Sequence, residues 1–360
     1  MILKRLASFL IIVVLVTSTF GQSTYFTFRT VHNGKDFRFP ILDLRRNKRV
    51  ETKVSQFLQL SELRALTNRK TKNIFEQVMI DDGSIYGRKV SLSFEVFTNS
   101  PRILSVGFYN SMDGATTHWW NSYYNFNAQN GDRISLRDLF SDDGYRKFVE
   151  LVVKSRSASY RSEVERTVEP GDREAFLGLL GLIERDDLSD FSIAADTITI
   201  DGENLLGKSL CCESLNMEVI FKLRDFRRYL NEYGRIVFNL QAGNLAKFRS
   251  NVLPQLFNGT VAGKSPFVAV LEIDPNNLVN GIYAYLRHGN GINLTGKIEG
   301  TNLELTEQVL RKGEMNVNTR SDHRWIDEGS ISGFFDSSVL NGVWTDSTKS
   351  RSFRLRASRK

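Results

Sequence analysis

The sequence contains little cysteine and little histidine, and both shortages limit the chemistry that it can support. The only cysteines in the 360 residues are the neighbours Cys211 and Cys212, which cannot join distant segments because adjacent cysteines can pair only through a small strained ring. The four histidines are scattered, and none lies beside a Gly-x-Ser-x-Gly elbow or at the spacing of a zinc site. No glycine-rich phosphate loop precedes a lysine. We therefore expect no metal and no cofactor.

Long apolar runs are also missing, apart from one at the N-terminus. Lys4 and Arg5 precede an apolar stretch over residues 6–16, and small polar residues follow it. This layout is typical of a secretory signal peptide, which we place at residues 1–21. Because the stretch is shorter than the ~20 residues that a spanning helix needs, we expect no transmembrane helix after cleavage. The sequence thus predicts an exported protein, periplasmic or secreted.

The charge is only modestly positive, at +7 for the whole chain. The basic residues are dispersed except at the C-terminus, where Phe353 and Leu355 alternate with arginines. This alternation predicts a solvated edge strand, and the alternative is a basic tail that touches anionic polymers or lipid. We expect no nucleic-acid partner.

The first part of the chain shows alternating strands and one amphipathic helix. An opening hairpin is predicted over residues 25–39, with an Asn-Gly turn, and a core-facing helix over 48–66. A second, antiparallel hairpin is predicted from residues 90–96 and 104–109. These elements favour a sheet with helices packed on it.

The segment 123–140 is interpreted as a corner around which this domain is organised. Two short strands meet at a polar turn, and the second strand carries Ile134 and Leu136. A helix is then expected from Ser141, because Asp142 and its neighbour suit the positive end of a helix. The turn and cap residues of this corner are read as structural.

The remaining patterns complete an α+β prediction. A helical stretch over 173–184 precedes strands over 191–200 and 217–223, and all-β patterning begins at Phe267. We predict an α+β domain with an antiparallel sheet over residues 22–240, a linker over 241–265 and a smaller all-β meander or barrel-like domain over 266–360, with a filled interior.

The candidate binding residues are His118, Trp119, Trp120 and Tyr123. Aromatic rings stack on sugar faces and anchor protein interfaces, so this cluster indicates a contact surface. The alternative is that neighbouring tryptophans on one strand divide between core and rim.

Paired carboxylates offer a different chemistry. Glu95, Asp113 and Asp132 could in principle supply the acid and base of a glycoside hydrolase, although a chain with 41 acidic residues offers many such choices. We therefore identify no catalytic residue and favour a protein that is not an enzyme.

Part of the chain, about residues 25–232, resembles a known bacterial domain. The likeness rests on the 91–109 hairpin, His118, Tyr124-Asn125-Phe126-Asn127, Gly131 and Leu136-x-Asp138-Leu139-Phe140. The similar domain, of unknown function, is extracytoplasmic and occurs in lysozyme-sensing anti-sigma factors and beside some peptidoglycan deacetylases. The resemblance implies an α+β fold with a binding or accessory role. A cytoplasmic portion and a deacetylase metal centre are both missing from the pattern, so signalling and deacetylation are not expected.

These observations favour an exported cell-envelope protein of bacteria that acts as a non-catalytic binding module. Its expected partner is a lysozyme-like protein or a cell-wall glycan such as peptidoglycan. One alternative is a hydrolase of cell-wall glycans or esters that uses carboxylates. Another is a structural subunit of an envelope assembly.

Overall fold

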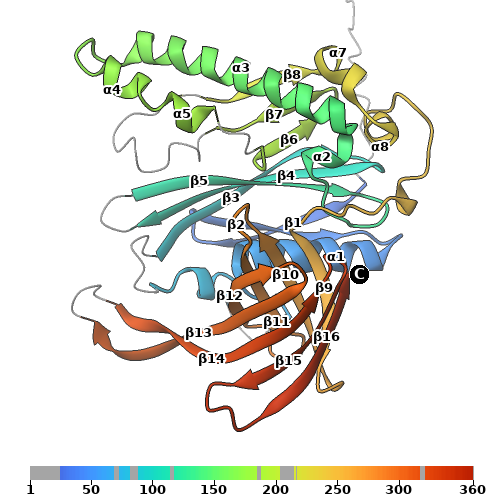
Figure 1. Cartoon of the computed structure of the whole chain (residues 1–360), viewed down its shortest axis with the longest axis vertical. Coiled ribbons are helices and arrows are strands. Elements are labelled where there is room, and N and C mark those ends of the chain that lie inside the picture. The colour runs from blue at the N-terminus through green and yellow to red at the C-terminus, as the bar shows by residue number, and fades with distance from the viewer. Residues whose placement is uncertain are drawn as a thin grey trace, which may run out of the picture.

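A computed structural model describes residues 25–68, 73–81, 88–113, 117–184, 188–202, 215, 217–316 and 321–359. The predicted signal peptide and both cysteines lie outside these residues. The described chain forms a three-stranded sheet, a five-stranded sheet and a closed barrel, which follow one another in that order along the long axis of the molecule, with helices between and above them (Figure 1).

The five-stranded sheet has its strands in sequence order, and both predicted hairpins belong to it. All neighbours are antiparallel except β2 and β3, which run parallel and meet only at Phe37 and Leu92. The sheet is therefore mixed, whereas an antiparallel one was predicted. Its strands are β1 (Thr27–Asn33), β2 (Phe37–Asp43), β3 (Arg88–Asn99), β4 (Ile103–Asp113) and β5 (Thr117–Asn127).

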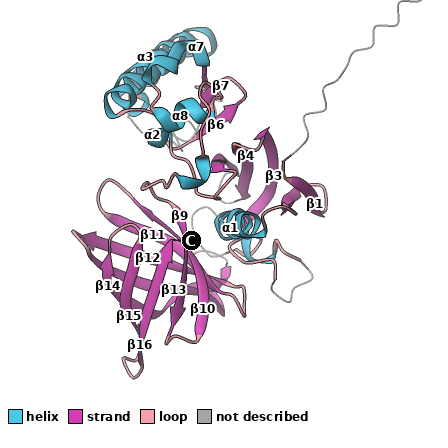
Figure 2. Ribbon diagram, turned by 90° about the vertical axis from the view of Figure 1, so that its right-hand side faces the viewer, coloured by secondary structure: helices cyan, strands magenta, loops and turns pink. Residues whose placement is uncertain are grey.

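The predicted amphipathic helix is α1 (Lys48–Leu58), which begins at the N-cap Asn47 and continues as a π-helical turn, η1 (Gln59–Leu63). Helix α1 lies between the five-stranded sheet and the barrel (Figure 2). One apolar cluster joins the three parts, because it contains α1 residues, sheet residues and the outward-facing barrel residues Val268 and Ala284. The two domains therefore share a core.

A second layer covers the opposite face of the sheet (Figure 1). Ser141 caps α3 (Asp142–Thr167) by accepting a hydrogen bond from the Gly144 N–H, which confirms the predicted helix start. The predicted helical stretch 173–184 is divided into two short helices. The other elements of the domain are α2 (Leu136–Leu139), α4 (Arg173–Leu177), α5 (Leu180–Ile183), β6 (Phe191–Ala194), β7 (Thr197–Ile200), β8 (Val219–Lys222), α7 (Leu223–Phe226), α8 (Glu232–Val237), and the 3-10 turns η2 (Glu76–Val78), η4 (Arg227–Tyr229) and η5 (Leu245–Lys247).

The prediction of a second strand in the 123–140 corner is wrong. After β5 the corner forms only isolated β-bridges, Phe126 with Arg133 and Phe140 with Leu230, and Leu136 lies in α2. The reason is a capping box: the Ser135 hydroxyl accepts from the Asp138 N–H, and the Asp138 carboxylate accepts from the Ser135 N–H. These paired bonds satisfy the free N–H groups of a helix start and so favour a helical turn over an extended segment.

The C-terminal domain is a closed barrel of eight antiparallel strands in meander order, which agrees with the predicted barrel-like domain. Strand β9 lies inside the segment 241–265, which was predicted to be a linker. The basic strand β16 was predicted to be an edge strand, but it pairs with both β15 and β9. The strands are β9 (Gln255–Val261), β10 (Ser265–Ile273), β11 (Leu278–Tyr285), β12 (Gly291–Glu299), β13 (Asn302–Asn316), β14 (Ser321–Phe335), β15 (Val339–Asp346) and β16 (Ser352–Arg359).

Buried apolar side chains and inward-facing glycines fill the barrel interior. At Gly259 on β9, an added Cβ would lie 2.4 Å from the ring of Phe267 and 2.6 Å from the Arg356 carbonyl oxygen. An eight-stranded barrel is just wide enough for its side chains, so this glycine gives the aromatic ring its space.

We expect Gly259→Ala to lower the free energy of unfolding by about 1–3 kcal/mol, which is the usual cost of overpacking a core. Chemical denaturation followed by circular dichroism measures the loss. Gly171→Ala is the matched control, because a Cβ there meets nothing within 4 Å. Equal stability of both variants would contradict the assignment of Gly259 to a packed interior.

In the described part of the chain, no helix is both long enough and apolar enough to cross a membrane.

Candidate functional site

A cleft of about 480 Å³ lies where the five-stranded sheet meets the barrel. The π-turn η1 and strands β3 to β5 form one wall, and residues of β11 to β14 with the loop between β11 and β12 form the other. Aromatic rings and polar groups line the cleft together. The aromatic lining residues are Trp120, Tyr124, Tyr285 and Trp325, and the polar ones are Ser61, Glu62, Arg64, Gln77, Lys89, Ser122, His288 and Asn290.

Glu62 is the central polar residue of this cleft. The Tyr124 hydroxyl donates to its Oε1 at 2.7 Å, and the Lys89 Nζ lies 3.4 Å from its Oε2. Burial, opposed by the Glu62 carboxylate, lowers the pKa of the Lys89 ammonium. Burial and then Glu62 raise the pKa of Tyr124, so its hydroxyl stays a donor. The three groups form a buried polar cluster with fixed geometry.

Trp120 borders this cluster. The Lys89 Nζ lies 5.3 Å from the centre of the Trp120 ring, and His118 stacks on the same ring at 6.1 Å with an interplanar angle of 14°. The cation over one side and the imidazole beside it hold the indole in place. Trp120 therefore presents a preorganised ring to the cleft.

Arg64 ties the two domains together at the cleft. It ends η1 in the left-handed conformation, with φ of 53°, and its carbonyl accepts from the Gly291 N–H at 3.0 Å. Its guanidinium donates to Asn293 Oδ1 at 2.6 Å and lies 4.9 Å from the centre of the Trp325 ring. The adjoining residues form a β-bridge, Ala65 with Asn290. The position of the barrel wall is thus set by the end of the π-turn.

The structure divides the four predicted binding residues between two faces of β5. Trp120 lines the cleft and His118 stacks on it, whereas Trp119 is 62% exposed on the other face. The Tyr123 hydroxyl donates to Asp201 Oδ2 at 2.8 Å, and its ring lies beside Phe97. Alternate residues of a strand point to opposite faces, so these residues do not form one surface.

Sequence patterns did not reveal Glu62, Arg64, Lys89 or Trp325 as site residues. The helical pattern of α1 is read at 3.6 residues per turn, and the wider π-turn η1 changes the direction of every side chain that follows it. A π-helical turn often occurs at functional sites, but it has no sequence signature that could have identified Glu62.

The carboxylates considered for catalysis lie elsewhere. Glu95 accepts from the Tyr109 hydroxyl at 2.9 Å, Asp113 is exposed at the end of β4, and Asp132 is buried beside Lys53. Glu62 is the single acidic side chain among the described residues that line the cleft. Hydrolysis of a glycoside usually needs two carboxyl groups across the bond, and this lining supplies one. The described residues also contain no group of three or more His, Cys, Asp or Glu side chains arranged to hold a metal ion.

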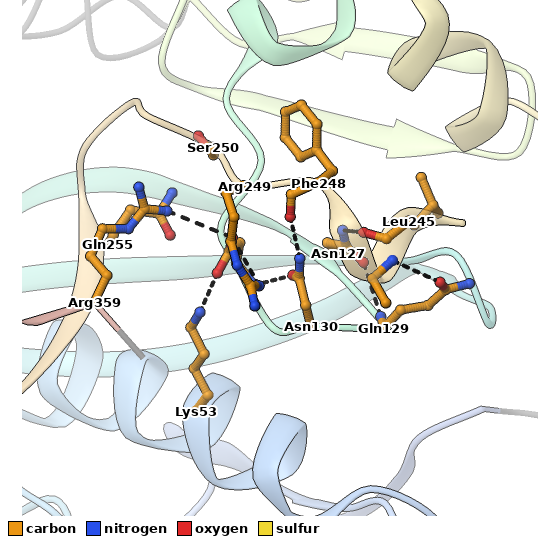
Figure 3. A network of polar contacts seen from close by, with 12 residues as sticks. Lys53, Asn127, Gln129, Asn130, Leu245, Phe248, Arg249, Ser250, Gln255 and Arg359 are labelled. Atoms are coloured by element: carbon orange, nitrogen blue, oxygen red, sulfur yellow. Dashed lines mark hydrogen bonds and ion pairs between the residues drawn. The ribbon is translucent and has the colours of Figure 1, made fainter. Parts of the chain in front are cut away.

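The polar turn after β5 supports the cleft from a distance. Its amides bind the chain that leads to the barrel: Asn127 Nδ2 donates to the Leu245 carbonyl at 2.8 Å, and Asn130 Nδ2 to the Phe248 carbonyl at 2.5 Å (Figure 3). Gln255 at the start of β9 both accepts from and donates to the backbone of Arg133. These bonds hold the barrel against the sheet.

The lining can hold a ligand that has both flat apolar faces and polar edges. Its volume lies within the ~300–1,000 Å³ range of small-molecule sites, and its rings and charges converge on one space. The sequence matches no protein-family model and no curated protein.

Proposed function

We propose that this chain is an exported cell-envelope protein of bacteria that binds a cell-wall glycan in the cleft between its two domains, without catalysis. The observation that carries the proposal is the lining itself, in which aromatic rings stand next to a buried cluster of Glu62, Tyr124 and Lys89. Sugar rings have apolar faces that stack on aromatic side chains and hydroxyl edges that need fixed donors and acceptors. Both requirements are met at one site.

Two further points support this proposal. The resemblance of residues 25–232 to an extracytoplasmic bacterial domain, found beside some peptidoglycan deacetylases, favours an envelope setting. Glu62, the single acidic side chain among the described residues that line the cleft, favours binding over the alternative of glycan hydrolysis, because its carboxylate is already engaged by Tyr124 and Lys89.

A protein partner is the second candidate, and one observation favours it. Trp119 is 62% exposed on the face of β5 opposite to Trp120. Tryptophan is enriched among the residues that dominate protein interfaces. A lysozyme-like protein would then contact Trp119 and leave the cleft unused.

Titration of the protein with soluble N-acetylglucosamine oligomers, followed by calorimetry, tests the proposal. We expect saturable binding, and Trp120→Ala should weaken it about 30-fold or more, which corresponds to about 2 kcal/mol. Trp119→Ala is the matched control and should bind like the unmodified protein. Failure of the oligomers and of soluble peptidoglycan fragments to bind would overturn the proposal, whereas loss of lysozyme binding in Trp119→Ala would support the protein partner.

A further inference from the structure

A second cavity of about 310 Å³ adjoins the cleft. The two cavities have three lining residues in common, Ser61, Ser122 and Tyr124. A shared wall of this kind means that the two spaces lie next to each other along the sheet-barrel junction. Each space by itself has the size of a small-molecule site, so together they have room for a longer ligand than either cavity could hold alone.

Strand β5 gives this combined groove its direction. Trp120 lines the first cavity alone, while Ser122 and Tyr124 line both. These alternate residues lie on one face of the strand, and four residues of β-strand extend over about 14 Å. The groove thus follows β5 away from Trp120.

The second cavity is more open to solvent than the first. Glu272 on β10 and Asn280 on β11 line it and are exposed. Arg133 also lines it and lies 6.0 Å from the centre of the Tyr124 ring. Within the described residues, the buried Nε–H of Arg133 has no hydrogen-bond partner. A buried donor without a partner is uncommon, and an oxygen of a ligand would satisfy it.

We infer that the ligand is an oligosaccharide chain that occupies both cavities, an inference that rests on the proposed function. One end of the chain stacks against Trp120 in the first cavity. The chain then passes Ser122 and Tyr124, and its hydroxyl groups reach Arg133, Glu272 and Asn280 in the second. Because the second cavity opens to solvent through exposed residues, a longer polymer can continue out of the groove.

The dependence of affinity on oligomer length tests this inference. Calorimetric titration with the disaccharide and the hexasaccharide of N-acetylglucosamine should give at least about tenfold tighter binding of the hexasaccharide. The double variant Glu272→Ala/Asn280→Ala should remove most of this gain and leave the affinity for the disaccharide unchanged. Asn280→Trp, which places a large ring in the second cavity, should act in the same way. Both changed side chains are exposed, so thermal unfolding should show that the variants fold normally.

The possible results separate the two proposals. Equal affinity for the two oligomers, or a length gain that survives both variants, would overturn the inference and leave a single-site glycan binder. Absence of binding to either oligomer and to soluble peptidoglycan fragments would overturn the proposed function itself.

Discussion

Asp132→Asn is expected to lower the free energy of unfolding by about 3–5 kcal/mol, the usual cost of removing one partner from a buried ion pair. The Asp132 carboxylate is ion-paired with the Lys53 Nζ, and both side chains are only 2% exposed. Nitrogens of Arg249 and Arg359 each lie 3.6 Å from its other oxygen. Asparagine keeps the shape but removes the negative charge that these three cations share.

Urea denaturation of two further variants separates charge from packing. Arg249→Ala should lower the free energy of unfolding by less than about 1 kcal/mol, because this side chain is 51% exposed and its charge is screened by solvent. In the double variant Asp132→Asn/Lys53→Met, the buried ammonium is gone as well, so much of the lost stability should return. If Asp132→Asn unfolded at the same urea concentration as the unmodified protein, the assigned role of this network would be wrong.

Phe57→Ala should lower the free energy of unfolding by about 3–5 kcal/mol, because it removes a buried aromatic ring from a packed core. Phe57 is 2% exposed, and its ring packs edge-on against Tyr124 at 5.6 Å and Phe126 at 5.4 Å. It belongs to the cluster shared by α1, the sheet and the outer face of the barrel. Its loss should therefore destabilise both domains together.

The positions of the tryptophans allow this coupling to be measured. Trp119 and Trp120 lie in the sheet, and Trp325 and Trp344 lie in the barrel, so fluorescence of a Trp119→Phe/Trp120→Phe background reports on the barrel alone. In that background Phe57→Ala should lower the unfolding midpoint of the barrel. Leu278→Ala is the control, because this side chain is 51% exposed, and it should change the unfolding midpoint of the barrel only slightly. A barrel midpoint that stayed unchanged in Phe57→Ala would show that the domains unfold independently.

Much of the fold was predictable because its signals are local. Alternating apolar residues identified the hairpins of β1 to β4, and Ser141 with its acidic neighbours identified the start of α3. The predictions failed where a contact between residues distant in the sequence, or a local capping interaction, decided the structure. One partner of β16 is β9, which lies nearly a hundred residues earlier in the sequence. No pattern within β16 indicates that contact.

The candidate site was less predictable for the same physical reason. Trp120 was found because an aromatic pair is conspicuous in a sequence, but the split between Trp119 and Trp120 follows from the alternation of the strand. Arg64 and Trp325 come together only after the barrel docks, since they belong to different domains. Glu62 is directed into the cleft by a π-turn, and amphipathic periodicity assumes that no such turn occurs.

The closure of the barrel between β16 and β9 also has a kinetic consequence. During synthesis β9 can pair with β10 at once, but its other edge has no partner until β16 has left the ribosome. Pairing between strands so far apart in the sequence is slow, because the chain loses the entropy of closing a long loop before the new contacts stabilise the pair. An unpaired strand edge invites pairing with other chains. The interval before ring closure is therefore the stage at which this protein is most exposed to aggregation, and at which a chaperone that covers the β9 edge would have its greatest effect.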